Sequence, residues 1–456
     1  MSKTQYVCQQ CGASFPKWSG QCLNCGAWNS LVEEVVAPPS KNLNRQITNA
    51  VDVSLSQLMN QATKDHTRLS TTIKEFDRVL GGGLVNGEVV LLAGSPGIGK
   101  STLLTQSVLG LITKGIQKNH QIVYVAGEEN PEQIALRIKR IIKSEHLSLD
   151  NIPQGELEEK LNKVKFLTTN QVEGVINYLK KNKPSLVVVD SIQTLVSANL
   201  SGAAGSVGQV RASAEKLIEY AKVSKVPLIL IGHVTKEGRV AGPMTLEHMV
   251  DAVLDFSGDK STDLRLLRAT KNRFGATDEV GVFQLDEFGF RSVANPSELF
   301  TSHQDVKKAV GAVFGCVVEG TRPLLVEVQA LAVRSYLPTP RRVGRGVDVA
   351  RLQVLTAVLE KYLKLPLGQY DIFVSIVGGY QTKEPALDLA VAAAIVSSLK
   401  NKPMGSRVFV GEVGLLGEVR KVKLFELRKK EVRRLGYKQL VSFQNLKHIS
   451  QLLKLR

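Results

Sequence analysis

Short apolar runs alternate with helical patterns through the middle of the chain. Four runs are rich in branched residues and show no polar alternation, as expected for strands buried on both faces of a parallel sheet. Amphipathic stretches separate them, so residues 51–298 are predicted to form an α/β domain. The predicted strands are Val89–Ala93, Ile122–Val125, Leu186–Val189 and Leu228–Ile231, and the predicted helices are Ser101–Leu111, Pro131–Ile142 and Gln209–Lys222.

The pattern changes on either side of this domain. Residues 1–30 are turn-rich and contain four paired cysteines. Residues 31–50 contain Pro38-Pro39 and show no clear hydrophobic periodicity, so they are predicted to form a linker. The turn signal at Asn295-Pro296-Ser297 precedes a domain over residues 299–456, which we expect to be α+β. Its predicted strands are Val313–Val318, Leu324–Ala330, Phe373–Val377 and Arg407–Val410, and its predicted helices are Val349–Lys361 and Ala386–Ser398.

Composition limits the classes of partner that the protein is expected to bind. Among 456 residues, Lys and Arg exceed Asp and Glu by 59 − 42 = 17, which favours a polyanionic partner such as nucleic acid. No uninterrupted apolar run reaches about 18 residues, so no membrane partner is expected. The N-terminal residues lack an apolar signal core, so we expect a cytoplasmic protein with reduced thiols.

Four of the five cysteines form two pairs, Cys8-x2-Cys11 and Cys22-x2-Cys25. Two intervening residues let one tight turn present both sulfurs to a tetrahedral ion. A redox dithiol is the alternative, but it predicts one motif near a βαβ unit rather than two in a leader. The spacing therefore predicts a four-sulfur Zn²⁺ site that folds a segment too short to build a core alone.

Residues 94–101 match the phosphate-binding pattern G-x-x-x-x-G-K-S between a predicted strand and a predicted helix, which is the setting the motif requires. Glycines let backbone N–H groups surround the phosphates of ATP, and the new helix directs its positive end there. Lys100 is expected at the β- and γ-phosphates, and Ser101 at Mg²⁺. The predicted nucleotide-binding residues are Gly94, Ser95, Pro96, Gly97, Ile98, Gly99, Lys100, Ser101 and Thr102.

Carboxylates follow two of the predicted strands. Asp190 ends the apolar run that begins at Leu186, where it is expected to hold Mg²⁺ together with Ser101. Glu128 and Glu129 follow the strand that begins at Ile122, at the edge where open α/β sheets bind ligands. We expect Glu129 to activate the attacking water, with Glu128 as the second choice. The alternative for this pair is an exposed acidic helix start.

Taken together, these motifs resemble the bacterial RadA family. The resemblance rests on the four cysteines, the phosphate loop, Gly127-Glu128-Glu129 and the run Lys271-Asn272-Arg273-Phe274-Gly275, with further agreement at Leu246–Asp251. It implies a RecA-like ATPase core, hexameric rings, and DNA-stimulated ATP hydrolysis in branch migration during recombinational repair. Single-stranded and branched DNA and a RecA-type recombinase are the implied partners. A nucleotide-switched DNA-binding scaffold with little turnover is the alternative.

In related ring motors, cations at this point of the fold reach the γ-phosphate in the neighbouring subunit. The resemblance therefore implies a catalytic role in trans for Lys271 and Arg273, on the turn after a strand at Leu264–Ala269. Without the resemblance, these residues could equally well form a basic turn on a solvated surface.

RecA-like motors also hold single-stranded DNA on two loops. The corresponding segments here are residues 197–208, rich in small residues, and residues 236–243. The expected DNA contacts are Arg211, Lys236 and Arg239, against the alternative of connectors with incidental charge. Lys17 and Trp18 of the cysteine segment are equally compatible with nucleic-acid contact and with exposure alone.

The last domain resembles the proteolytic domain of Lon proteases, which use a serine–lysine dyad. The segment matching the serine motif, Thr382–Asp388, has no serine, and the lysine position falls at or near Glu426. Covalent catalysis needs both groups, so we expect no proteolysis. Further on, the run Arg428-Lys429-Lys430-Glu431 is expected to form an exposed helix face. A cluster of arginines fits either duplex DNA or a solvated or intersubunit surface: Arg334, Arg341, Arg342, Arg345 and Arg351.

Overall fold

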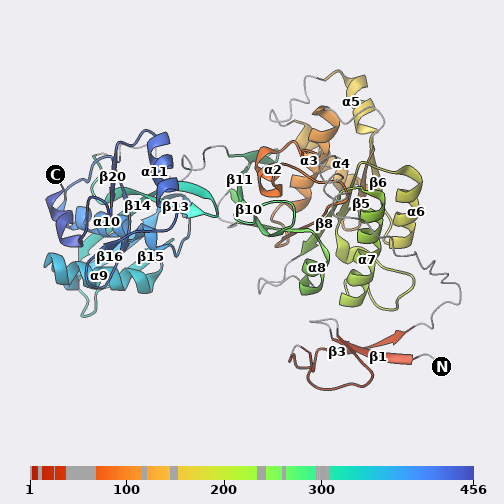
Figure 1. Ribbon diagram of the computed structural model, residues 1–456, viewed down its shortest axis with the longest axis horizontal. Helices are drawn as coiled ribbons and strands as arrows, with labels where there is room; N and C mark the ends of the chain where they lie inside the picture. The colour runs from red at the N-terminus through yellow and green to blue at the C-terminus, as the bar shows by residue number, and fades with distance from the viewer. Residues whose placement is uncertain are drawn as a thin grey trace, which may run out of the picture. The chain divides into compact units, whose positions relative to one another are not determined.

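The computed structural model describes residues 3–8, 13–24, 26–36, 68–114, 121–143, 152–233, 243–258, 263–293, 295, 297, 306 and 308–455. The chain forms two compact units, Met1–Val293 and Ala294–Arg456 (Figure 1). The first contains the cysteine-paired segment and the α/β domain, and the second contains the C-terminal domain.

A sheet that has nine strands among the described residues forms the centre of the α/β domain, in the order β12-β11-β10-β9-β4-β8-β7-β5-β6. Strands β9, β4, β8, β7, β5 and β6 are parallel, and β10–β12 extend one edge in antiparallel pairing. The predicted α/β class is confirmed. The strands are β4 Val89–Gly94, β5 Ile122–Ala126, β6 Val164–Leu167, β7 Leu186–Asp190, β8 Leu228–His233, β9 Ala252–Ser257, β10 Leu264–Asn272, β11 Val280–Leu285 and β12 Phe290–Ser292.

Alternate strand residues enter two different helix layers. In β4, Val90 and Leu92 pack with α2, α3 and α4, whereas Val89 and Leu91 pack with α6, α7 and α8. This two-sided burial explains why the central strands show no polar alternation. The helices are α2 Lys74–Leu80, α3 Lys100–Lys114, α4 Pro131–Ile142, α5 Gln154–Leu161, α6 Val172–Asn182, α7 Val207–Ser224 and α8 Pro243–Met249.

Local signals set the limits of the helices that flank the site. Asn130 accepts from the Gln133 backbone in a reciprocal capping box, and Pro131 takes the first helical position of α4. Helix α7 begins after Ser206, whose side chain accepts from the backbone N–H of Gln209, and ends before Lys225 in the left-handed region at φ 56°.

The cysteine segment is a small three-stranded ribbon, order β2-β1-β3, made of β1 Lys3–Cys8, β2 Ser14–Phe15 and β3 Leu31–Val36. In its described part, the buried apolar cluster consists of Cys8, Cys22 and Leu31. So small a core does not stabilise a fold without a cross-link, which is consistent with a structural metal.

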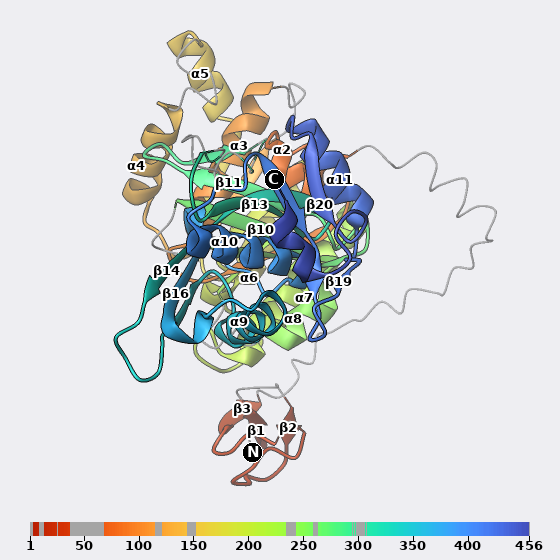
Figure 2. The same ribbon diagram turned by 90° about the vertical axis from the view of Figure 1, so that its left-hand side faces the viewer.

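The C-terminal unit is a mixed six-stranded sheet, order β15-β16-β14-β13-β17-β20 among the described residues, with α10 buried against it (Figure 2). Strands β18 and β19 form a separate hairpin. The elements are β13 Ala312–Glu319, β14 Arg322–Arg334, β15 Arg342–Arg345, α9 Val349–Leu363, β16 Tyr370–Ile376, α10 Asp388–Lys400, β17 Arg407–Val410, β18 Glu412–Val413, β19 Val419–Arg420, α11 Phe425–Arg434 and β20 Gln439–Ser442.

One expectation for this unit is wrong. The basic run that begins at Arg428 reads as an exposed helix face, but Arg428 is only 1% exposed. Its guanidinium donates to the Cys316 carbonyl and pairs with the partly exposed Glu384, so these partners compensate its buried charge.

Within the described residues, every helix is too short or too polar to cross a membrane.

Candidate nucleotide-binding site

The phosphate loop joins β4 to α3, as its sequence context predicts. Lys100, the first residue of α3, is only 4% exposed, and its ammonium donates to the carbonyls of Gly94 (2.8 Å) and Ser95 (3.1 Å). Burial lowers the pKa of Lys100 from 10.5 to about 8, although Asp190 and Glu128 oppose the shift. A buried ammonium beside a glycine-rich loop is suited to an anionic ligand.

Two glycines of the loop lie close to aromatic residues of β9 and β12. A Cβ at Gly94 would lie 2.4 Å from the Phe256 carbonyl oxygen, and one at Gly99, where φ is +108°, would lie 2.5 Å from the Phe290 ring. Phe256, Phe283 and Phe290 pack edge-to-face, with centroids 5.3–6.2 Å apart. This aromatic support for the loop was not predicted from the sequence.

The acidic groups come together because β5 and β7 are neighbours. Ala126 is in register with Asp190, which brings the turn after β5 beside the end of β7. Asp190 is 4% exposed and accepts from the Tyr124 hydroxyl at 2.6 Å. Burial, followed by the Asp190 charge, raises the pKa of Tyr124 well above its usual value, so the phenol keeps its proton and orients the carboxylate.

The two adjacent glutamates have different partners. Ser191 donates a hydrogen bond to Glu128, whose charge also acts on Lys100. Glu129 instead forms an ion pair with the buried Arg137, which also donates to the Thr105 hydroxyl at 3.1 Å. In this geometry Glu128 belongs to the phosphate site and Glu129 anchors α4.

Sequence reasoning missed three residues of this site. Ser191 directly follows the predicted magnesium ligand, and Tyr124 lies in a predicted strand, so each was marked by position but not by a motif. Arg137 is the buried cation on α4. A charged residue on the apolar stripe of an amphipathic helix is the signal that was available for it.

The basic run differs in part from the predicted turn. Lys271 and Asn272 still belong to β10, and the bend begins at Arg273. A register shift between Ala269 and Lys271 redirects the strand end, as bulges do. The Lys271 ammonium donates to the carbonyls of Glu247 (2.7 Å) and His248 (3.3 Å), and burial is the largest cause that lowers its pKa.

Arg273 lies at the opposite end of the sheet from the phosphate loop of the same chain. Its backbone N–H donates to the Asp251 carbonyl (3.1 Å), and the Asp251 N–H donates to Val89, the first residue of β4, whereas the loop begins at Gly94. Five steps of about 3.3 Å put these ends about 16 Å apart, beyond the reach of one arginine side chain. The Arg273 side chain is 58% exposed.

The expected DNA contacts are only partly described. Arg211 is exposed on α7, where it pairs with Glu215 at 2.9 Å. Lys236 and Arg239 lie outside the described residues. The first expected DNA loop is held to α7 by Gln209, which accepts from the Ser197 N–H (2.7 Å) and donates to the Leu200 carbonyl (2.6 Å).

The ribbon presents two matching knuckles. The Cys8 N–H donates to the Ala13 carbonyl (2.9 Å) and the Cys22 N–H to the Ala27 carbonyl (2.8 Å), five residues on in each case. Both cysteines are buried. Cys11 and Cys25 lie outside the described residues. Paired thiols on equivalent turns are a donor set that suits Zn²⁺.

The arginine cluster of the C-terminal unit divides into two kinds. Arg342 donates to the carbonyls of Leu367 (2.8 Å) and Tyr370 (2.6 Å), and Arg351 pairs with the buried Asp388, so both hold the fold. The remaining three arginines, Arg334, Arg341 and Arg345, are exposed.

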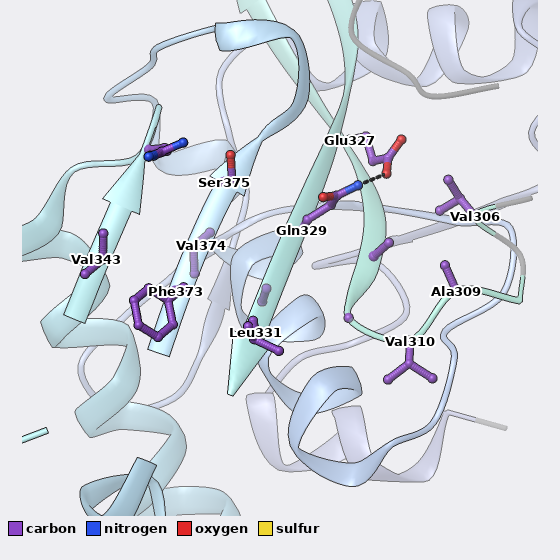
Figure 3. A pocket seen from close by; sticks show the side chains of 14 residues that line it. Val306, Ala309, Val310, Glu327, Gln329, Leu331, Val343, Phe373, Val374 and Ser375 are labelled. Carbon is purple, nitrogen blue, oxygen red and sulfur yellow. Dashed lines mark hydrogen bonds between the residues drawn. The ribbon is translucent and has the colours of Figure 1, made fainter. Parts of the chain in front are cut away.

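A cavity of about 580 Å³ lies on the same sheet (Figure 3). Leu331, Val343 and Phe373 from three neighbouring strands line it, with Glu327 on the far side bonded to Gln329 at 2.7 Å. This lining is largely apolar and contains no glycine-rich loop at a helix start, so it differs from the phosphate site.

Comparison with known proteins identifies the class. The KaiC ATPase family matches residues 69–281, and the rubredoxin metal-binding domain family matches residues 6–33. The protein is therefore a RecA-like ATPase with an N-terminal zinc ribbon, which the phosphate loop and paired cysteines predict.

Relatives over nearly the whole length identify the family. The chain is 44% identical to DNA repair protein RadA of Pseudomonas aeruginosa over 442 residues, covering 96% of this chain and 92% of that protein. It is 41% identical to RadA of Bacillus subtilis over 443 residues, with the same two coverages. The chain belongs to the RadA family of DNA repair proteins. The crystal structure of the RadB recombinase is 26% identical, covers 49% of this chain and 99% of its own, and has a TM-score of 0.38.

Proposed function

We propose that the protein is a DNA-dependent ATPase that processes recombination intermediates by branch migration, as a ring of identical subunits working with a RecA-type recombinase. The observation that carries the proposal is the distance between the phosphate loop and the exposed Arg273, at opposite ends of one sheet. A ring places the exposed end of one subunit against the nucleotide of the next. The names of the relatives support the role in DNA repair.

The phosphate loop binds ATP through its backbone N–H groups and Lys100, which leaves the Gly94 and Ser95 carbonyls for the β- and γ-phosphates. Ser101 and Asp190 would hold Mg²⁺, which neutralises phosphate charge when bound. Tyr124 keeps the Asp190 carboxylate oriented toward that position.

Glu128, rather than Glu129, is the residue that orients and deprotonates the attacking water. Its carboxylate bonds to a hydroxyl and lies near Lys100, so it is available at the phosphate end. Glu129 is held by the buried Arg137 and serves to place α4.

Arg273, with Lys271 beside it, supplies positive charge to the nucleotide of the neighbouring subunit. Such a finger stabilises transition-state charge and commonly contributes about 10³-fold or more to the rate. Arg211, Lys236 and Arg239 contact the backbone of single-stranded DNA, so affinity falls as salt rises.

ATP hydrolysis with and without single-stranded DNA tests the proposal. We compare wild type, Lys100→Ala, Arg273→Ala and a mixture of the two variants. DNA stimulation lost in each variant and partly regained in the mixture supports a DNA-driven ring with a finger in trans. Hydrolysis indifferent to DNA would replace this proposal with the nucleotide-switched scaffold.

The choice of base has its own test. Glu128→Gln is expected to reduce kcat by about 100-fold or more while ATP binding is kept, because general-base catalysis contributes about 10²–10⁴. Glu129→Gln removes an ion pair whose carboxylate is already engaged by Arg137 and is expected to keep most of the rate. The reverse order of the two rates would assign the base to Glu129.

We further propose that Cys8, Cys11, Cys22 and Cys25 hold one structural Zn²⁺. Both tryptophans of the chain, Trp18 and Trp28, lie in the ribbon, so intrinsic tryptophan fluorescence reports on this segment alone. A chelator is expected to change that fluorescence and release one Zn²⁺ per chain. Unchanged fluorescence with no metal released would remove the zinc assignment.

The C-terminal unit acts as a scaffold without peptidase activity. Leu387 is buried in the segment where Lon carries its serine, and the adjacent Asp388 is engaged by Arg351. Hydrolysis of a fluorogenic casein by the wild-type protein, but not after Lys100→Ala, would contradict this assignment.

A further inference from the structure

Asp251 connects the first residue of β4 to Arg273, the proposed finger, through hydrogen bonds. Its backbone N–H donates to the Val89 carbonyl (2.9 Å), and its carbonyl accepts from the Arg273 N–H (3.1 Å). Its carboxylate accepts from the Val89 N–H (2.9 Å) and reaches the Arg273 guanidinium at 3.3 Å. The side chain is 2% exposed, so one buried carboxylate is bonded both to the first residue of β4 and to the exposed finger.

A second cation shares the same carboxylate. Lys222, near the end of α7, forms an ion pair with the oxygen of Asp251 that also accepts from Val89. Glu88 lies beside them, fully buried, and burial raises its pKa to about 7, with the Asp251 charge adding to the rise. Two neighbouring buried acids need compensating charge: Lys222 and Arg273 pair with Asp251, and the charges of Arg68 and Lys222 act on Glu88.

Other residues hold the backbone of the turn. Arg68 donates to the carbonyls of Phe274 (2.6 Å) and Gly83 (3.0 Å), and Asn272 donates to the Val79 carbonyl (3.2 Å) while accepting from the Phe274 N–H (2.9 Å). The turn is therefore anchored to the segment around α2 without Asp251. The carboxylate adds a specific contact with the side chain of Arg273.

We propose that Asp251 is a positioning residue for the Arg273 finger, and that Lys222 sets how tightly Asp251 holds it. The proposal rests on the proposed function, in which Arg273 acts on the neighbouring nucleotide. Asp251 touches no nucleotide, and its effect passes entirely through the guanidinium that it holds. With Lys222 in place, Asp251 is shared between two cations, and Arg273 is oriented while most of its side chain stays accessible.

Helix α7 connects the contacts of Asp251 with its two cations to the first expected DNA loop. Its 18 residues span about 27 Å at 1.5 Å per residue, from Val207 at the loop to Ser224, two residues after Lys222. Gln209 holds the loop at one end and Lys222 holds Asp251 at the other. A shift of the helix on DNA binding therefore changes the Lys222–Asp251 contact and with it the placement of Arg273.

Asp251→Asn tests the positioning role. The amide retains an acceptor for the Val89 N–H but loses the charge that holds Arg273. We expect kcat to fall about tenfold with KM for ATP unchanged, the size of one charge-assisted hydrogen bond. Asp278→Asn is the matched control, because Asp278 is exposed just beyond the turn and loses the same charge.

The double variant separates positioning from a structural effect. If Asp251 acts through the finger, Asp251→Asn combined with Arg273→Ala is no slower than Arg273→Ala alone. Multiplied losses in the double variant, or a kcat for Asp251→Asn equal to wild type, would overturn the proposal. Thermal melting and nucleotide binding establish that each variant is folded.

Lys222 gives a second route that does not alter the buried acid. Lys222→Met leaves Arg273 as the cation on Asp251, so the ratio of DNA-stimulated to basal rate is expected to fall about threefold, as for a half-exposed ion pair. Lys222→Arg should restore the ratio, and Lys180→Met, at an exposed position of α6, is the control. An unchanged ratio in Lys222→Met would overturn the coupling to α7.

The variants distinguish the finger itself from the network that positions it. If Arg273→Ala hydrolyses ATP at the wild-type rate, the proposed finger is wrong and the role of Asp251 falls with it. If Arg273→Ala is slow but Asp251→Asn and Lys222→Met match their controls, the finger stands and only the positioning network is wrong.

Discussion

The phosphate-binding groups of the nucleotide site and the C-terminal unit both bury charged side chains, but these side chains have different kinds of partner. In the C-terminal unit, the buried Arg428 pairs with Glu384, and Arg351 pairs with the buried Asp388. In the nucleotide site, the buried Lys100 bonds to loop carbonyls, while Asp190 and Glu128 accept from hydroxyl groups.

The pKa shifts have opposite directions for the same reason. The hydrogen bond that Arg351 donates to Asp388 raises the pKa of Arg351, because the charged form has its partner in the fold. Burial lowers the pKa of Lys100, because its compensating charge is not fully supplied by the protein. A buried charge that is paired holds the fold, whereas one that is desolvated beside a cradle is prepared for a ligand.

Removing Lys100 gives the largest expected effect on activity. Lys100→Ala should reduce ATP hydrolysis by about 100-fold or more, as expected for loss of a preorganised charge at the phosphates. Because burial of the ammonium is unfavourable, the melting temperature should not fall. A strong loss of Tm would mean that Lys100 holds the fold, as the C-terminal arginines do.

Removing Arg428 should do the opposite. Arg428→Met leaves the partly exposed Glu384 without its cation and removes a charged donor, and such a loss costs about 2 kcal/mol of unfolding free energy. Denaturant unfolding should show the loss in the C-terminal transition, with basal ATP hydrolysis kept. The double change Arg428→Met with Glu384→Met should regain most of the stability, and failure to do so would point to the shape of Arg428 rather than its charge.

The pH dependence of nucleotide binding sharpens the comparison. The lowered pKa, about 8, means that Lys100 is charged below pH 8 and loses its proton above it. Phosphates bind the charged form, so ATP affinity should be level below pH 8 and fall about tenfold per unit above it. Lys100→Arg should show a flat profile over the same range, and an equally steep profile would trace the effect to another group.

The smallest expected effect concerns the hydroxyl that orients Asp190. Tyr124→Phe removes one buried hydrogen bond, so kcat should fall about fivefold, in line with about 1 kcal/mol for such a bond. When the rate is titrated with Mg²⁺, the ion should bind more weakly than it does to the wild-type protein. Tyr178→Phe, on α6, is the matched control, and equal rates for the two would remove the orienting role.

The parts that could be predicted from the sequence are local in the chain. Strands such as Val89–Gly94 are continuous apolar runs, and the phosphate loop lies between one of them and a helix. The paired cysteines and the run Lys271–Gly275 are recognised from residues only a few positions apart. These features need only near neighbours, so a linear pattern reveals them.

Local sequence does not decide whether Glu128 or Glu129 is the better candidate for the base. Both follow the same strand, and only the packing of Arg137 from α4 against one and of Ser191 from the end of β7 against the other separates them. Lys271 was expected in the turn, but a bulge of β10 against β9 keeps it in the strand. Both outcomes depend on partners distant in sequence.

The sequence by itself determined the α/β class, the order of the domains, the phosphate cradle and the metal-binding pattern, because each is written in residues that are close along the chain. Only the tertiary structure decided which charges are paired. It buried Arg428 against Glu384, lowered the pKa of Lys100, and joined Lys222, Asp251 and Arg273 into one network. The free energy of a charge depends on burial and on partners that meet only when the chain has folded.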